Sequence, residues 1–319
     1  MPLDLRISLH KLDVLSRVVS LGGVGKAAED LFVAQPVVSA HLRSLENRLG
    51  GAELFYREGR RLHLTEAGRA VHAWAEDVLT RTRELERHLA SLSDGSTGSV
   101  VMGASMSVGS YVLPHVLTSF RARHPGAALR LGISSTEHAI EETRAGVLDF
   151  AVVVTEPNLE LPGMEVEQIG SDEIVLVAAP DSEPHGDVIS VHELGSLPFI
   201  ETPEGFIRRT FVERRLRAAG VHDRNVVLQL GHPEAMKRAA QEGLGVTLLF
   251  RTAVRNELDS GLLREVRVTG VDVVVPIALV HRKGKSFSAL HKNLIAEIRT
   301  AVWEASPERV RAEPVLAAP

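Results

Sequence analysis

An apolar stripe between residues 71 and 92 constrains the fold of this chain more than any other feature of its sequence. Its members alternate in steps of four and three residues and are Val71, Ala75, Val78, Thr82, Leu85, Leu89 and Leu92. This spacing is typical of a coiled-coil seam, and the other faces of the segment are charged. The pattern predicts a helix over residues 66–92 that pairs with a second copy of the chain through Val71, Ala75, Val78, Leu85, Leu89 and Leu92. The alternative is a helix that packs on its own chain.

The segment before this helix, residues 1–65, has the pattern of three short helices followed by a hairpin. Apolar residues recur at helical spacing from Leu9 to Val19. In a second short helix we expect four residues to face inward: Ala27, Ala28, Leu31 and Phe32. A third helix begins near Pro36, a residue that a first turn tolerates, and its expected buried stripe is Val37, Val38, Leu42, Leu45 and Leu49. A turn at residues 58–59 between two apolar runs predicts a two-stranded wing.

Residues 93–98 form a short polar hinge, and the pattern changes after it. In residues 99–319, apolar strands alternate with helical segments, which predicts parallel sheets covered by helices on both faces. Two such sets and a late apolar strand indicate two lobes joined by crossover strands. Lobe I is expected over about 99–168 and 269–319, and lobe II over about 169–268. A cleft between lobes is a natural place for a small ligand.

Composition excludes several classes of protein. The chain has no cysteine, which excludes disulfides, thiolate metal sites and a cysteine nucleophile. Its 14 histidines are scattered without metal-ligand spacing, and neither G-x-S-x-G nor H-E-x-x-H occurs. We therefore expect no enzyme, no bound metal and no cofactor. The charged N-terminal residues and the lack of an apolar run of about 18 residues predict a cytoplasmic protein that does not contact membranes.

Charge is distributed unevenly along the chain. Residues 1–65 hold 9 Lys/Arg and 7 Asp/Glu, whereas the remainder holds 27 and 34. A slightly basic head on an acidic protein fits contact with DNA through a local patch better than general coating of nucleic acid.

The stretch over residues 25–70 resembles the winged helix-turn-helix of LysR-type transcriptional regulators. The matching features are an A-A-E helix, a Q-P-x-x-S helix ending in R-x-L-E-x-x-L-G, and a wing with L-F-x-R and G-R-x-x-x-L-T-x-A-G. The stretches FRARHPG, AGVLDFAVV and PEAMKRAAQEGLGVTLL match further along, so the resemblance covers essentially the whole chain.

The resemblance implies a multidomain fold of α+β and α/β parts: a winged helix-turn-helix, a linker helix, and a two-lobed sensor similar to periplasmic binding proteins. It implies a sequence-specific regulator that binds double-stranded DNA, responds to a small-molecule effector, forms homodimers or homotetramers and works with RNA polymerase. The sensor half is most similar to members tied to sulfur or inorganic-anion metabolism, so we expect an anionic or carboxylate effector. Two alternatives are a constitutive regulator with a vestigial sensor and a solute-binding protein.

Nine residues are candidates for contact with DNA. The second helix of a helix-turn-helix places its first half in the major groove, which indicates Gln35, Pro36, Ser39, His41 and Arg43. The Gln35 amide is suited to an adenine edge. On the wing, Arg57, Arg60 and Arg61 are suited to phosphates or the minor groove, and Lys26 opens the second helix. The alternative for each is a solvated surface residue.

Seven residues are candidates for contact with the effector. Ser105 and Ser107 follow the first sensor strand, where free amides at a helix start favour an anion. The resemblance adds Thr136, Thr155, Thr202, Arg208 and His232, which match positions along the family's effector cleft. For the hydroxyl residues and His232, the alternative role is that of a helix cap.

Overall fold

The computed structural model describes residues 6–59, 61–93 and 98–306. Arg60 and most of the predicted hinge therefore lie outside the described residues. The chain forms two compact units: a head unit, up to residue 93 and including residues 145–147, and a sensor unit, which comprises the rest. Within the described ranges, no helix is both long and apolar enough to cross a membrane.

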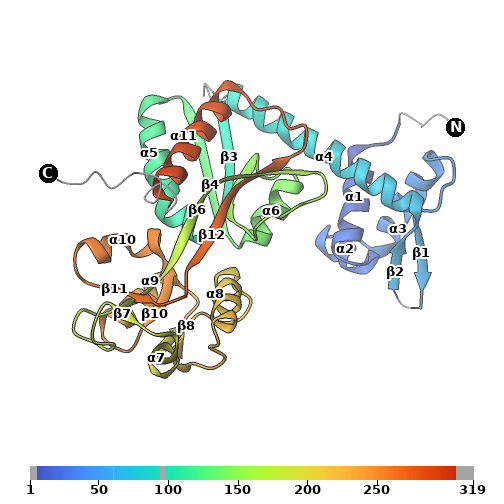
Figure 1. The fold of residues 1–319 in the computed structure, drawn as a ribbon. Helices are drawn as coiled ribbons and strands as arrows, with labels where there is room; N and C mark the ends of the chain where they lie inside the picture. Colours follow the sequence, from blue (N-terminus) through green and yellow to red (C-terminus); the bar gives the residue numbers. More distant parts are fainter. Residues whose placement is uncertain (1–5, 60, 94–97, 307–319) are drawn as a thin grey trace. The chain divides into compact units, whose positions relative to one another are not determined.

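The head unit consists of three short helices, a hairpin and a long helix. They are α1 (Leu9–Ser20), α2 (Val24–Asp30), α3 (Gln35–Arg48), β1 (Phe55–Glu58), β2 (Arg61–Leu64) and α4 (Glu66–Ser93). Figure 1 shows them in blue and cyan. The core between these elements contains fully buried leucines and valines, among them Leu15, Val38, Leu45 and Leu54. The predicted winged helix-turn-helix is confirmed.

Two apolar residues of the head that were expected to face inward are exposed. Phe32 is 95% exposed and has a φ of 54°, because it lies in the turn between α2 and α3, where a left-handed backbone directs its side chain into solvent. Val37 is 41% exposed, because the buried stripe of α3 begins at Val38, about 100° further around the helix.

Thr65 and Gly68 fix the start of α4. The Thr65 hydroxyl accepts a hydrogen bond from the Gly68 N–H at 2.9 Å and donates one to the Glu53 carbonyl oxygen at 2.7 Å. A Cβ on Gly68 would lie 2.0 Å from the carbonyl oxygen of Leu54, so only glycine permits this close approach. The long helix is thereby tied to the wing.

The first half of the α4 stripe packs on its own chain. Ala75 is fully buried with Leu79 in the head core, and Val71 and Val78 pack against the same core. Helix α1 covers this part of α4. The prediction that Ala75 faces a second copy is therefore corrected, because the core of its own chain covers it fully. Val71 and Val78 are only partly buried, and their pairing with a second copy stays a prediction.

The second half of the stripe differs. Leu85 and Leu89 are 56% and 52% exposed. The side chain of Leu92 lies outside what the structure describes. Pairing of this second half with a second copy of the chain stays a prediction.

Lobe I of the sensor unit is built around the first three sensor strands. Its elements are β3 (Gly98–Ser105), the π-helical turn η1 (Val108–Val112), α5 (Leu113–Arg123), β4 (Ala127–Ser134), α6 (Thr136–Arg144), β5 (Phe150–Val154) and the closing helix α11 (Ala289–Ala305). All five residues of β5 are buried, as an apolar strand between two layers of helices requires.

Lobe II follows in the chain. Its elements are β7 (Val188–Ile189), α7 (Val191–Ser196), β8 (Pro198–Glu201), α8 (Ile207–Ala218), β9 (Asn225–Gln229), α9 (Pro233–Gln241), β10 (Thr247–Phe250), α10 (Arg251–Asp259) and β11 (Arg264–Val268). Two long strands, β6 (Met164–Ala178) and β12 (Val273–Arg282), run between the lobes (Figure 1).

The crossover strands join most of the sensor strands into one sheet. The strand order is β4-β3-β5-β12-β6-β11-β7, with β10 also on β6, and β8 and β9 form a separate parallel pair. The prediction of purely parallel sheets is wrong at the crossover. Strand β12 is antiparallel to both β5 and β6, because it returns the chain from lobe II to lobe I.

Candidate nucleic-acid interface and inter-lobe cleft

Helix α3 presents a polar face from its first turn onward. Gln35 and Pro36 are exposed, and Ser39 and Arg43 follow Gln35 at intervals of four residues, so Gln35, Ser39 and Arg43 line the same side. The Arg43 Nε donates weakly to the Ser39 carbonyl oxygen at 3.4 Å. This face offers amide, hydroxyl and guanidinium groups, the kinds of donor and acceptor that read base edges in a major groove.

His41 lies apart from this face. Its ring packs edge-on against that of His10 on α1, with 4.8 Å between the ring centres. Burial, followed by the charges of His10 and Lys11, lowers the pKa of His41. The structure therefore places His41 at the α1–α3 contact, because residue 41 is about 200° around the helix from residue 39.

The wing and α2 carry the remaining candidates for DNA contact. Arg57 is exposed on β1, opposite Leu62 of β2. Lys26 is exposed on α2. Arg60 lies outside the described residues, and the side chain of Arg61 is likewise not described. The structure thus places Arg57 on the hairpin surface, as a contact to phosphate requires.

In the sensor unit, three of the seven effector candidates line one small cavity between the lobes. Ser105 and Ser107 contribute from lobe I and Arg208 from lobe II. The apolar side chains of Phe206 and Phe250 also line it, and its volume is about 70 Å³. The structure thus brings together three of the seven predicted residues, and their role in effector binding stays a prediction.

Arg208 is the charged residue of this cavity and is only 7% exposed. Its guanidinium donates hydrogen bonds to the Leu248 carbonyl oxygen and to the Thr202 hydroxyl, and lies 3.0 Å from the Met236 sulfur. Within the described part of the chain, no carboxylate forms an ion pair with it. Burial lowers the pKa of Arg208 to about 10, although electrostatic interactions with Glu201 and Tyr111 act to raise it.

The two serines differ in what their hydroxyls do. The Ser105 oxygen accepts a hydrogen bond from the Val154 N–H at 3.1 Å. Ser107 is 4% exposed, precedes η1 and has no side-chain hydrogen bond among the described residues. A nearly buried hydroxyl with unused donor and acceptor capacity, next to the free amides of a helix start, is suited to an anion.

The other effector candidates have structural partners instead. The Thr136 hydroxyl donates to the Val154 carbonyl oxygen at 3.0 Å, and Thr155 is buried outside the cavity lining. His232 is exposed and caps α9 by accepting a hydrogen bond from the Glu234 N–H at 3.2 Å. Thr202 reaches the cavity only through Arg208. For Thr136 and His232 the structure thus supports the cap or backbone role over direct lining.

Two contacts across the lobes were not predicted from the sequence. The Tyr111 hydroxyl of η1 donates to Glu234 of α9 at 2.7 Å. Arg214 of α8 binds Glu156 of lobe I through two hydrogen bonds of 2.7 and 2.9 Å. These partners lie far apart in the sequence and belong to no periodic pattern, so only the folded lobes bring them together.

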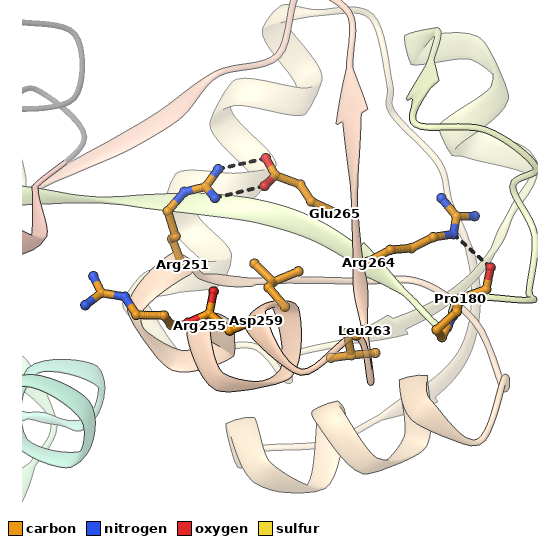
Figure 2. A pocket seen from close by; sticks show the side chains of 9 residues that line it. Pro180, Arg251, Arg255, Asp259, Leu263, Arg264 and Glu265 are labelled. Atoms are coloured by element: carbon orange, nitrogen blue, oxygen red, sulfur yellow. Dashed lines mark hydrogen bonds and ion pairs between the residues drawn. The ribbon is translucent and has the colours of Figure 1, made fainter.

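A larger hollow on lobe II, of about 660 Å³, is lined by several arginines (Figure 2). Arg251 binds Glu265 at 2.7 and 2.8 Å and Glu173 at 3.0 Å. Arg264 donates to the carbonyl oxygens of Pro180 and three further residues of the same loop. Carboxylates neutralise both guanidinium groups: Arg251 pairs with Glu173 and Glu265, and Arg264 lies 3.9 Å from Asp187. The case for an anion is therefore weaker here than at Arg208, whose acceptors in the described chain are neutral. Across the described residues, no group of three or more His, Asp or Glu side chains could hold a metal ion.

Two family models match this chain. The helix-turn-helix of the bacterial regulatory lysR family matches residues 9–69, and the LysR substrate binding domain matches residues 93–303. A probable RuBisCO transcriptional regulator of Emiliania huxleyi is 29% identical over 300 residues, which cover 92% of this chain and 95% of the relative. This relative gives no support to the expected tie to sulfur metabolism.

Solved structures share the fold. Full-length OxyR from Pseudomonas aeruginosa matches with a TM-score of 0.60 and 19% identity over 92% of this chain and 94% of that one. The CcmR regulatory domain of Synechocystis PCC6803, solved in complex with 2-PG, matches with a TM-score of 0.57 and 19% identity over 65% and 98% of the two chains. Both family models, one for each unit, lead to one assignment: the chain belongs to the LysR family and is a DNA-binding transcription regulator with an effector-binding domain.

Proposed function

We propose that the effector of this regulator is a small anion, held between the lobes by Arg208, and that it controls how the heads bind DNA. The observation that carries the proposal is a buried guanidinium without a carboxylate partner in the described chain. Burial of an unpaired charge is unfavourable unless an opposite charge or strong hydrogen bonds compensate for it.

The surroundings of Arg208 complete an anion site. Its present acceptors, a carbonyl oxygen and a hydroxyl, are neutral dipoles. A carboxylate or phosphate would supply the missing negative charge and accept a charge-assisted hydrogen bond. Ser107, whose hydroxyl is unused, lines the same cavity from the other lobe.

The size of the cavity predicts movement of the lobes. A volume of about 70 Å³ is about that of two water molecules, so an effector of more than a few atoms requires the lobes to separate. The crossover strands β6 and β12 would bend, and the Tyr111–Glu234 and Arg214–Glu156 contacts would change. An anion that binds one closure state more tightly shifts the equilibrium toward that state.

Exposed apolar surfaces support assembly of the chain with itself. Leu85 and Leu89 on α4 favour a homodimer through the linker helices. The edge strands β4 and β9 expose Ile133 (44%), Val226 (40%) and Val227 (45%), and such edges favour further pairing into a homotetramer.

We further propose that paired heads read two half-sites of an operator. Gln35, Ser39 and Arg43 would enter the major groove, while Arg57 and Lys26 would contact phosphate. A change in lobe closure would alter the spacing of the heads, the bend of the DNA and access of RNA polymerase. Such a protein acts where the chromosome lies, in the cytoplasm.

Calorimetric titration of the full-length protein tests the anion proposal. The panel is inorganic phosphate, inorganic sulfate, 2-PG and small di- and tricarboxylates. We expect one of them to bind, and Arg208→Met to weaken it about a hundredfold, the loss of one charge-assisted contact. Arg215→Met, an exposed position on the same helix, is the matched control and should bind as the parent does.

A second variant keeps the test valid if Arg208→Met folds poorly. Ser107→Ala removes one donor without changing the buried charge and should weaken the same anion about tenfold. Equal affinity of parent and both variants would refute the placement of the effector. If no anion binds while operator DNA is still recognised, the constitutive regulator with a vestigial sensor is the better description.

A further inference from the structure

A second pocket between the lobes is distinct from the Arg208 cleft. Its volume is about 720 Å³, within the range of small-molecule sites. Lobe I contributes η1, α5 and the end of α11, and lobe II contributes α9 and α10. Ser105, Ser107 and Arg208 do not line it.

One wall of this pocket carries a buried charge network. Lys237 is 5% exposed, and its ammonium group lies 2.7 Å from Glu234, 2.8 Å from Glu257 and 3.0 Å from the Ala253 carbonyl oxygen. It also lies 5.2 Å from the centre of the Tyr111 ring. All three hydrogens of the ammonium group therefore have acceptors.

Glu257 is left with unused capacity. Its Oε1 accepts from Lys237, but its Oε2 is buried and has no hydrogen-bond partner in the described chain. A buried carboxylate oxygen without a donor is unfavourable, and a ligand with an N–H group would satisfy it.

The rim of the pocket offers the opposite charge. Arg255 of α10 is exposed and forms no hydrogen bond or ion pair with the residues that the structure describes. Figure 2 shows its side chain extending away from Arg251 and Arg264. Asn256 and His115 are exposed beside it on the lining and can also donate hydrogen bonds.

We propose that this pocket binds a free α-amino acid, with its ammonium group at Glu257 and its carboxylate at Arg255. A simple anion would leave the Glu257 oxygen unsatisfied. A simple cation would make no use of the exposed Arg255 guanidinium, whose charge acts within the described chain on the carboxyl of Asp172. Because Tyr111 and Glu234 join the two lobes along this wall, the ligand binds one closure state more tightly than the other and acts as a second signal.

Thermal unfolding of the full-length protein with each standard L-amino acid at millimolar concentration identifies the ligand, and titration calorimetry gives its Kd. We expect Glu257→Gln and Arg255→Gln each to raise that Kd at least about tenfold. Arg238→Gln, an exposed arginine of α9 outside the pocket, is the matched control and should not change it.

Three results would overturn the proposal. The first is that no amino acid binds. The second is that the amino acid binds Arg255→Gln as tightly as the parent, a variant whose exposed position leaves the fold intact. The third is that Arg208→Met abolishes binding while Glu257→Gln and Arg255→Gln retain it, since the ligand would then occupy the first cleft.

Discussion

The buried carboxyl of Asp172 gives a stability prediction whose magnitude follows from the structure. Asp172 lies on the crossover strand β6 and is 2% exposed. The Glu173 N–H donates to it at 2.9 Å, and the Thr252 hydroxyl of α10 donates to its other oxygen. Burial raises the pKa of Asp172 from 3.8 to about 6, although the hydrogen bonds from Thr252 and Glu173 oppose that rise.

The raised pKa links stability to pH with a definite sign. Between about pH 4 and pH 6 the folded protein holds a proton that the unfolded chain has released, so the free energy of unfolding falls as pH rises. Two pKa units at about 1.4 kcal/mol each amount to about 3 kcal/mol. This contribution to the free energy of unfolding is lost progressively as the pH rises to about 6 and is absent above that pH.

Asp172→Asn removes this titration. The free energy of unfolding of the variant minus that of the parent should rise by about 3 kcal/mol between pH 4 and pH 7.5. This rise does not depend on how stable the variant is at any single pH. Urea denaturation of the sensor transition at several pH values measures the difference, and Asp181→Asn, an exposed carboxylate, is the control. A parent–variant difference that stays constant across this range would refute the reasoning.

Four further perturbations test other parts of the account. Gly68→Ala should destabilise the head by about 1–3 kcal/mol, because the new Cβ would overlap the Leu54 carbonyl group, and an unchanged head transition on heating would contradict this. Replacement of both Leu85 and Leu89 by lysine should lower the molar mass in light scattering, whereas an unchanged mass would remove α4 from the dimer interface. Gln35→Ala should cost about 1–3 kcal/mol of discrimination at one base pair, and unchanged site preference would mean that α3 is misplaced. Arg57→Ala should weaken binding at all sequences and reduce the salt slope by about one, and a sequence-dependent loss would argue for a base contact instead.

Periodicity in the sequence was sufficient to predict most elements, because a helix or strand that buries one face repeats its apolar residues at a fixed interval. It failed where too few apolar residues follow that interval. Helix α10 fully buries only Ala253 and Val254, with Leu258 partly buried beside them, so its apolar stripe is too short to indicate a helix. Strand order was also out of reach, since β12 pairs with β6 from about a hundred residues away and antiparallel to it.

The α4 stripe shows a different limit. A heptad pattern indicates that its apolar residues are covered by another surface, but it does not identify that surface. The core of the same chain covers Ala75, whereas Leu85 is exposed. Phe32 illustrates a local limit, because a left-handed φ in a turn reverses the direction that helical spacing assigns to a side chain.

The candidate effector site was predictable in part. Ser105, Ser107 and Arg208 line one cavity because Ser105 ends β3, Ser107 follows it, and Arg208 lies in the first turn of α8 on the other lobe. Thr136 and His232 meet the same sequence criteria, yet they bond to nearby backbone groups. Sequence alone does not separate these outcomes, because a hydroxyl or ring nitrogen near a helix start serves equally as cap or ligand.

DNase footprinting on fragments that the protein retains from its own genome tests both DNA recognition and its control by an effector. The footprints are made at stated salt, with and without the anion identified by calorimetry. A regulator that binds two half-sites should protect an interrupted palindrome over several helical turns. The anion should also change the pattern for the parent protein and not for Arg208→Met. Failure to protect any sequence would contradict the regulator assignment, and an anion response that persists in Arg208→Met would contradict the proposed effector site.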